Sequence, residues 1–468
     1  MRTSGKRIRK TVSKSAVGAA MVAASLIGMP IQAGAATGTP STTAVVHWGS
    51  LRQQIVGFGA SGAFGQAASL QMMPAKDRNK VLSLLFSAKN GIGLDIVRSL
   101  VNDGVDGKTI EPAPGQWDWN IQPDDQIWLM NEARKYGVTT LMSTPWSPPA
   151  WMKKNDAVAG GKNVLTNVLL PKYYHAYAVY LAKYVTGYWS HFHIRINVIS
   201  IQNEPNWNTN YASCVWTPQQ FDTFIREDVI PVFKQYDVQA KLMMPEQLNW
   251  GEQYALPTLK DPIASKAVSI VAAHGYAGTV APLPVAEREH KQVWETEIST
   301  FGPDDPSITD GLHWAKVVND YLTVANVNAW NYWWLTNTGT DNEGLININP
   351  VTGKYVLNKR LFTIGNYSRF VRPGYYRIAA ARSPMAGVFL SAFKDPKTGR
   401  FAVVLVNENN STSTLDVSMK GLSHGPSSVV PYVTSATKNL QEGSPVAFSQ
   451  GMFTAALPAQ SVTTYVGN

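Results

Sequence analysis

Three acidic residues of this chain stand where apolar, strand-like runs end. Residues 196–201 form a β-branched apolar run that predicts a buried strand, and Pro205 prevents that strand from continuing. Asn203 and Glu204 therefore follow its carboxyl end. In an α/β barrel, a carboxyl at such a position is more often chemical than structural. The alternative is that Glu204 is a polar loop residue that caps the next helix.

A second apolar run, residues 292–297, carries two further candidates, Glu295 and Glu297. Side chains alternate along a strand, so both are expected on the same face, and alternation does not choose between them. Glu297 lies nearer the carboxyl end of the run than Glu295, and this position favours Glu297 as the catalytic carboxyl. Two carboxyls from different strand ends suit retaining glycoside hydrolysis, in which they lie about 5–5.5 Å apart. One would act as nucleophile, and the other would be protonated at rest and donate to the leaving oxygen.

The elements that must bring these carboxyls together are strands and helices in alternation. Eight strand-like stretches are expected at residues 54–62, 93–100, 138–144, 196–201, 240–244, 269–274, 292–297 and 328–334. Helix-like stretches between them include 75–86, 124–136, 171–188, 218–233 and 308–324. This count and spacing predict an α/β fold, a (β/α)8 TIM barrel over residues 52–369, in which strands four and seven face each other. A doubly wound open sheet is the alternative architecture.

The pattern changes at residue 370, where short strands separated by turn residues begin. The expected strands are 387–393, 401–407, 412–419, 427–432 and 461–466. They predict an appended antiparallel β-sandwich over residues 370–468. Residues 36–51 are expected to be a linker followed by a strand that joins this sandwich. The sandwich is expected to brace the barrel, because no clear aromatic stripe marks a sugar-binding face.

The N-terminus predicts a secreted protein. Residues 1–35 contain six basic and no acidic residues, an apolar stretch and a small-residue cleavage site, which together are typical of a signal peptide. Without this segment the chain has 35 basic and 32 acidic residues, so the net charge of +9 gives little support to a nucleic-acid partner. No second hydrophobic span follows, so no membrane association is expected. A monomer is expected.

Cysteine usage excludes an intrachain disulfide and any cysteine-based metal spacing. Cys214 is the only cysteine among the 468 residues. We therefore expect no metal and no cofactor, and a fold that a large core stabilises. The 15 Trp and 19 Tyr residues suit sugar rings as well as a large core.

Several segments together carry a family resemblance. They are Asn203-Glu204-Pro205, Trp294-Glu295-Thr296-Glu297, residues 144–153, residues 368–374 and residues 457–464. In combination they resemble glycoside hydrolase family 30 over nearly the whole mature chain. The Asn-Glu-Pro triplet alone is shared by many barrel glycosidases, so the specificity lies in the combination.

The resemblance implies a retaining, double-displacement mechanism in which Glu204 is the acid/base and Glu297 the nucleophile. It implies that Asn203 hydrogen-bonds the sugar 2-hydroxyl and that Arg98 pairs with the nucleophile and keeps it ionised. The alternative for Arg98 is a structural pair with Asp95 or another carboxyl.

Further substrate-binding residues follow from the same resemblance. Tyr276 matches a tyrosine near the nucleophile, and His274 matches a histidine on the sixth strand, which could equally be a wall residue. Trp146 and Trp333 match tryptophans on which sugar rings stack. Trp333 is favoured over Trp334 for this role. The alternative for either residue is that it belongs to the barrel core. Glu246 is interpreted as substrate-contacting or structural, not catalytic.

The substrate implied is β-1,4-xylan, because residues 58–67 and 84–94 look most like the xylan-cleaving branches of the family. Positions where those enzymes hold a glucuronic acid branch with arginine differ here. One of these positions matches Gln66, and the other falls in residues 335–344, which contain neither Arg nor Lys. A strict requirement for that branch is therefore not implied. The alternatives are the same chemistry on a β-1,6-glucan, a β-1,6-galactan or a β-glucoside, or an inactive carbohydrate-binding barrel.

Overall fold

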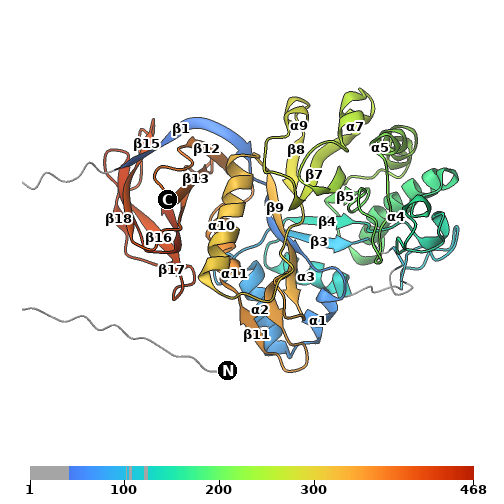
Figure 1. Ribbon diagram of the computed structural model, residues 1–468, viewed down its shortest axis with the longest axis horizontal. Coiled ribbons are helices and arrows are strands. Elements are labelled where there is room, and N and C mark those ends of the chain that lie inside the picture. The colour runs from blue at the N-terminus through green and yellow to red at the C-terminus, as the bar shows by residue number, and fades with distance from the viewer. Residues whose placement is uncertain (1–41, 102, 105–107, 121–124, 468) are drawn as a thin grey trace, which may run out of the picture. The chain divides into compact units, whose positions relative to one another are not determined.

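A closed parallel barrel forms the larger part of the computed structural model, which describes residues 42–101, 103–104, 108–120 and 125–467. Its strands are β2 (Gly57–Ser61), β3 (Ile96–Leu100), β4 (Thr140–Thr144), β5 (Val198–Ser200), β6 (Lys241–Asn249), β7 (Val268–Ala277), β8 (Gln292–Glu295) and β9 (Ala329–Asn337). Each pairs in parallel with the next, and β9 pairs with both β8 and β2. This closure confirms the predicted (β/α)8 barrel and excludes the open sheet (Figure 1).

Helices connect the barrel strands and surround them. They are α1 (Gln66–Met72), α2 (Ala75–Phe86), α3 (Gln126–Lys135), α4 (Tyr174–Phe192), α5 (Pro218–Phe224), α6 (Ile230–Gln235), α7 (Leu256–Lys260), α8 (Ala264–Ala267), α9 (Pro284–Arg288), α10 (Ile308–Thr323) and α11 (Lys359–Ser368). Thr217 and Gln220 start α5 with a capping box, each side chain bonding the other's backbone N–H. A π-helical turn joins α5 to α6, so the helix predicted at 218–233 is nearly continuous.

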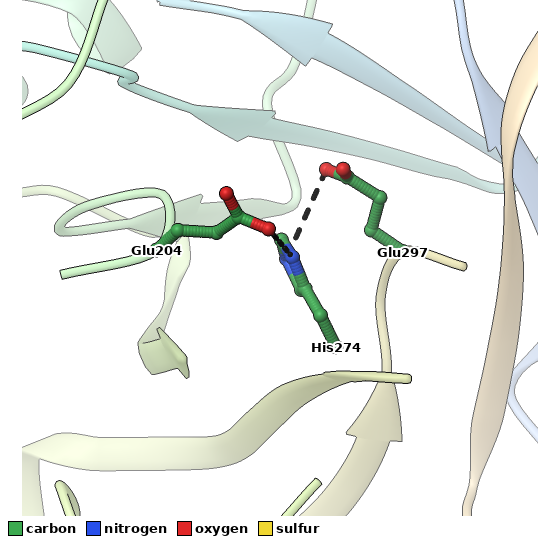
Figure 2. Close-up of side chains that lie close together, drawn as sticks. All are labelled: Glu204, His274 and Glu297. Carbon is green, nitrogen blue, oxygen red and sulfur yellow. Dashed lines mark hydrogen bonds and ion pairs between the residues drawn. The ribbon is translucent and has the colours of Figure 1, made fainter. Parts of the chain in front are cut away.

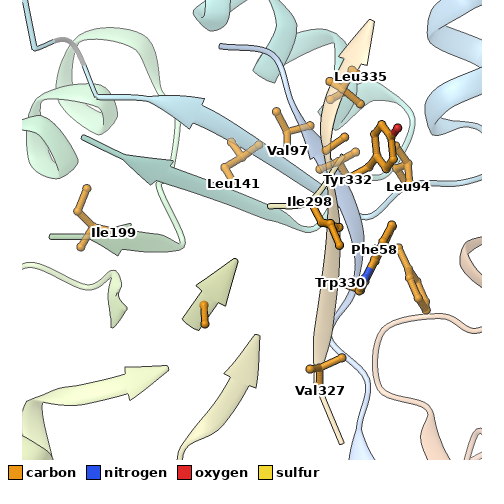
Figure 3. Packing of buried hydrophobic residues seen from close by; sticks show 14 of the residues in the cluster. Phe58, Leu94, Val97, Leu141, Ile199, Ile298, Val327, Trp330, Tyr332 and Leu335 are labelled. Carbon is orange, nitrogen blue, oxygen red and sulfur yellow. The ribbon is translucent and has the colours of Figure 1, made fainter. Parts of the chain in front are cut away.

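Side-chain alternation along the strands produces two layers of core. Inward residues such as Ile96, Met142 and Trp294 fill the barrel interior. Their neighbours Val97 and Leu141 face outward and pack under the helices in a much larger cluster. Figure 3 shows part of this outer cluster, with residues from β2, β3, β4, β5 and β9. These cores hold the strand ends that carry the acidic residues.

The second set of strands forms a mostly antiparallel sheet. Its members are β1 (Thr43–Gln54), β12 (Tyr376–Ala380), β13 (Val388–Lys394), β14 (Phe401–Asn407), β15 (Ser413–Lys420), β16 (Ser428–Thr434), β17 (Gln441–Glu442), β18 (Val446–Ala447), β19 (Met452–Leu457) and β20 (Ser461–Gly467). Phe453 on β19 contacts Tyr465 on β20 although the two strands are distant in the sheet order, so the sheet folds over its own core.

Strand β1 joins this sheet from the other end of the chain. It pairs antiparallel with β12 and parallel with β15, the one parallel pairing there among the described residues. Figure 1 shows β1, in blue, among the red strands. The predicted signal peptide, residues 1–35, and most of the predicted linker lie outside the described residues.

Helix α11 contacts the sandwich directly. The amide of Asn366 donates hydrogen bonds to the carbonyl oxygen of Tyr432 and to Oγ1 of Thr464, both at 3.0 Å. Strands β10 (Gly344–Ile348) and β11 (Tyr355–Leu357) extend the barrel sheet beyond β9, which the sequence pattern did not predict. Among the described helices, none is long and apolar enough to cross a membrane. Cys214 is buried and free.

Candidate active site

Glu204 follows β5 in a sharply turned segment. Its backbone φ of 44° lies in the left-handed region, which a non-glycine residue adopts only when its surroundings enforce it. Here the Glu204 N–H donates to the carbonyl oxygen of Glu246 at 3.0 Å. The preceding Gln202 amide donates to the carbonyl oxygens of Trp146 and Asn203 at 2.7 and 2.8 Å. The segment is therefore fixed from both sides, and Glu204 is a cavity wall residue instead of a helix cap.

The structure separates Glu295 from Glu297. Strand β8 ends at Glu295, so strict alternation does not extend to Glu297, and the expectation that both lie on one face is wrong. The Glu295 carboxylate accepts hydrogen bonds from the backbone N–H groups of Glu297 and Asn331 at 2.9 and 3.2 Å. Glu297 lines the same cavity as Glu204, whereas Glu295 supports the backbone behind it.

Glu204, His274 and Glu297 converge from three strand ends (Figure 2). One carboxylate oxygen of each glutamate and one ring nitrogen of His274 all lie within 4.8 Å of one another. His274 Nδ1 lies 3.0 Å from Glu204 Oε1, and its Nε2 lies 3.9 Å from Glu297 Oε2. Because the side chains of all three are almost completely buried, their charges interact strongly.

Arg98, in the middle of β3, is the cation beneath this pair. Its guanidinium forms an ion pair with Glu297, donates to Asn203 Oδ1 at 2.7 Å and contacts Glu246 Oε1 at 3.1 Å. It also lies under the Trp146 ring, 4.4 Å from the centroid. Asp95, the alternative partner expected from the sequence, pairs with Arg372 instead of Arg98.

Glu246 is a buried partner of Arg98 and is absent from the cavity wall. Its Oε2 accepts from Thr144 Oγ1 at 2.9 Å. Burial alone would raise its pKa, but Arg98 and then His274 lower the pKa of this carboxyl to about 2. Glu246 is therefore ionised at neutral pH and pairs with Arg98.

The pKa values of His274 and Glu297 are both raised, for different reasons. Burial lowers the pKa of His274, but the carboxylates of Glu297, Glu204 and Glu246 outweigh it and raise the pKa to about 10. Burial and the nearby Glu204 raise the pKa of Glu297, against the opposing effect of His274 and Arg98. Tyr276 donates a hydrogen bond to Glu297 Oε1 at 2.9 Å, which favours the ionised carboxylate.

The same three side chains, Glu204, His274 and Glu297, are close enough together to hold a metal ion. A histidine that binds a metal ion must have a neutral ring. The raised pKa of His274 keeps its ring protonated at neutral pH. The donor set therefore fits a hydrogen-bonded acid cluster better than a metal centre.

A cavity of about 530 Å³ opens above these carboxyls. Trp146 and Trp333 both line it, with ring centroids 5.7 Å apart, and Trp334 lines it as well. Six other wall residues were not predicted from the sequence: Phe64, Trp207, Tyr211, Leu248, Phe301 and Glu343. Leu248 lies on β6 and Trp207 lies three residues after Glu204, and the others lie on loops whose fold local patterns do not encode.

Comparison with known proteins agrees with this geometry. Residues 55–369 match the family model described as Glycosyl hydrolase family 59. The glycoside hydrolase family 30 subfamily 8 xylanase Xyn30A of Clostridium acetobutylicum is 30% identical, with a TM-score of 0.78, and the match covers 92% of this chain and 100% of that chain. The catalytic domain of GH30 xylanase C of Talaromyces cellulolyticus is 26% identical, with a TM-score of 0.80, covering 91% of this chain and 100% of that chain.

A curated relative matches over the full length. Glucuronoxylanase XynC of Bacillus subtilis (strain 168) is 27% identical over 473 residues, which cover 99% of this chain and 99% of that protein. The resemblance seen in the sequence motifs is thus confirmed. The chain is a glycoside hydrolase that belongs to family 30, with a barrel that also matches the family 59 model.

Proposed function

We propose that the protein is a secreted, monomeric, retaining glycoside hydrolase that cleaves β-1,4-xylan by double displacement. The observation that carries the mechanism is the closeness of Glu204 and Glu297, whose nearest oxygens lie within 4.8 Å. This separation suits direct attack by one carboxylate, whereas an inverting enzyme needs about 6.5–9.5 Å to admit a water molecule. The xylanases among its relatives support the substrate.

The charges in the cluster support the assignment of roles. Arg98 and protonated His274 supply two positive charges. These charges face three carboxyl groups, those of Glu204, Glu246 and Glu297. Glu246 is ionised, and Glu297 has two fixed donors, Arg98 and Tyr276, aimed at its carboxylate. Glu204 lines the cavity beside Glu297 and lacks these two donors. We therefore assign Glu204 as the acid that protonates the leaving oxygen and Glu297 as the nucleophile.

The reaction proceeds in two steps. Glu297 attacks the anomeric carbon while Glu204 gives its proton to the departing oxygen, and a glycosyl–enzyme ester forms. Glu204, now ionised, takes a proton from a water molecule that releases the sugar. His274 holds one Glu204 oxygen at 3.0 Å, which leaves the other free to exchange this proton. Asn203, whose Oδ1 accepts a hydrogen bond from Arg98, is the residue that we assign to the sugar 2-hydroxyl.

Trp146 and Trp333 provide apolar wall surface for sugar rings above the carboxyls. Their exposed fractions are only 2% and 7%, so each presents a small part of its ring to the cavity and leaves the rest in the wall. A cavity of this size holds a few sugar units, which suits a chain substrate.

Product analysis tests the substrate. The protein is incubated separately with linear xylo-oligosaccharides, arabinoxylan, glucuronoxylan and a β-1,6-glucan, and the products are separated by chromatography. We expect release of short xylo-oligosaccharides. Turnover of the β-1,6-glucan together with inert xylans would overturn the substrate while leaving the mechanism intact.

Replacing Arg98 by lysine should move the acidic limb of the pH profile to higher pH. Lysine keeps one charge but cannot contact Glu297, Glu246 and Asn203 at once, so the Glu297 carboxylate loses stabilisation and its pKa rises. Because the nucleophile must be ionised, activity at low pH falls, and we expect the limb of kcat/KM to shift upward by about one unit. The exposed Arg382, replaced in the same way, is the control. An unchanged acidic limb in R98K would contradict the role given to this ion pair.

A further inference from the structure

The cavity contains a third carboxyl, Glu343, which the two-carboxyl mechanism does not use. It lies on the connection between β9 and β10 and lines the same cavity as Glu204 and Glu297. Among the described residues that line this cavity, none is Arg or Lys. Arg98, below the Trp146 ring, is already engaged by carboxylates and by Asn203. An acidic sugar entering here meets negative charge without a free cation.

The backbone around Glu343 is held firmly in place. Its N–H donates to Asp341 Oδ1 at 3.0 Å. The preceding Asn342 is buried, and its Oδ1 accepts from the guanidinium of Arg360 at 2.9 Å. The following Gly344 begins β10, which pairs with β9. The position from which the Glu343 side chain enters the cavity is therefore set by structured neighbours on both sides.

The electrostatic environment of Glu343 couples it to the reacting residues. Burial, then the negative charges of Asp341 and Glu297, raise its pKa to about 7. Glu343 thus gains its charge close to neutral pH, and it is near enough to Glu297 for the two to influence each other. Any further carboxylate placed in the cavity would add to this repulsion, because like charges brought together in a partly buried site are unfavourable.

We propose that Glu343 is a specificity-determining residue, which makes the cavity accept neutral sugar chains and disfavour chains that carry a uronic acid branch. Its carboxylate repels the branch carboxylate, and it accepts hydrogen bonds from the hydroxyl groups of a neutral sugar. This inference rests on the proposed action on xylan and names the kind of xylan that the cavity selects.

The test is the ratio of two kcat/KM values, one on a xylo-oligosaccharide with a single glucuronic acid branch and one on the unbranched chain of equal length. In the unaltered protein we expect a ratio well below one. In E343Q the ratio should rise about tenfold, and in E343K further, because the repelling charge is removed or reversed. E408Q, which makes the same charge change at an exposed site on the sandwich, should leave the ratio unaltered.

The pH dependence of the ratio provides a readout that a purely structural role would not move. Below about pH 7 Glu343 becomes neutral, so discrimination against the branched chain should weaken as the pH falls from 8 to 6. That dependence should disappear in E343Q. A ratio that is the same in E343Q and the unaltered protein at every pH, with unbranched xylan still cleaved, overturns the role of Glu343. Failure of the unaltered protein to cleave either chain overturns the proposed function itself, and with it this inference.

Discussion

Replacing Glu297 by glutamine is expected to lower kcat/KM on xylo-oligosaccharides by at least about 10,000-fold, because no nucleophile remains to form the glycosyl–enzyme ester. Glutamine has nearly the same size and still accepts a hydrogen bond from Tyr276, so folding should survive. The measurement is initial-rate kinetics, with thermal unfolding as a check on the fold. Substrate binding, followed by calorimetry, should persist in this variant.

Glu295 provides the matched control, because it lies two residues away and is also buried. Its carboxylate contacts backbone N–H groups and not the cavity, so E295Q should lose far less activity than E297Q. The reverse order of activities would exchange the roles of the two residues. A second check uses E297A with azide and a dinitrophenyl xylobioside. Azide then replaces the missing carboxylate, and the product should be the α-glycosyl azide.

Replacing Glu204 by glutamine should give an effect that depends on the leaving group. A sugar leaving group needs a proton, so kcat/KM on xylo-oligosaccharides should fall by about 100- to 10,000-fold. A dinitrophenolate leaves without one, so kcat/KM on the dinitrophenyl glycoside should fall much less. The glycosyl–enzyme ester should then accumulate, because the base that activates water is gone, and a burst of dinitrophenol should be visible.

The product formed with azide distinguishes Glu204 from Glu297. In E204A, azide attacks the glycosyl–enzyme ester that Glu297 has already formed, and the product should be the β-glycosyl azide. Equal loss on both leaving groups, or an α-azide from E204A, would be incompatible with Glu204 as the acid/base. The two alanine variants therefore yield opposite anomers from the same reagents.

The sequence predicted those features that depend on local patterns. The apolar run before Glu204 and the one before Glu297 each mark a buried strand, and eight such runs predict a barrel that brings their ends together. Motif resemblance supplied Arg98, Asn203 and Tyr276, whose side chains the structure places around these carboxyls. Helix and strand types were correct for the long elements, and their bounds differed by a few residues.

The features that sequence could not supply depend on long-range contacts. Alternation does not distinguish Glu295 from Glu297, because the strand ends between them and the backbone turns there. The contact between His274 and Glu204 joins residues 70 positions apart. Glu343 lines the cavity because the neighbouring Asn342 is buried beside Arg360 and because β10, which follows Glu343, pairs in parallel with β9. None of these arrangements has a local signature.

The placement of β1 beside β12 and β15 has a consequence for the order in which the chain can fold. The residues that β1 must pair with lie more than 300 positions later in the chain, so the backbone groups of this strand stay unpaired until those residues are made. A long strand with free edges invites pairing with other chains during that interval. Correct assembly therefore depends on synthesis running to the end, and a chain that stops after α11 retains β1 without its partners.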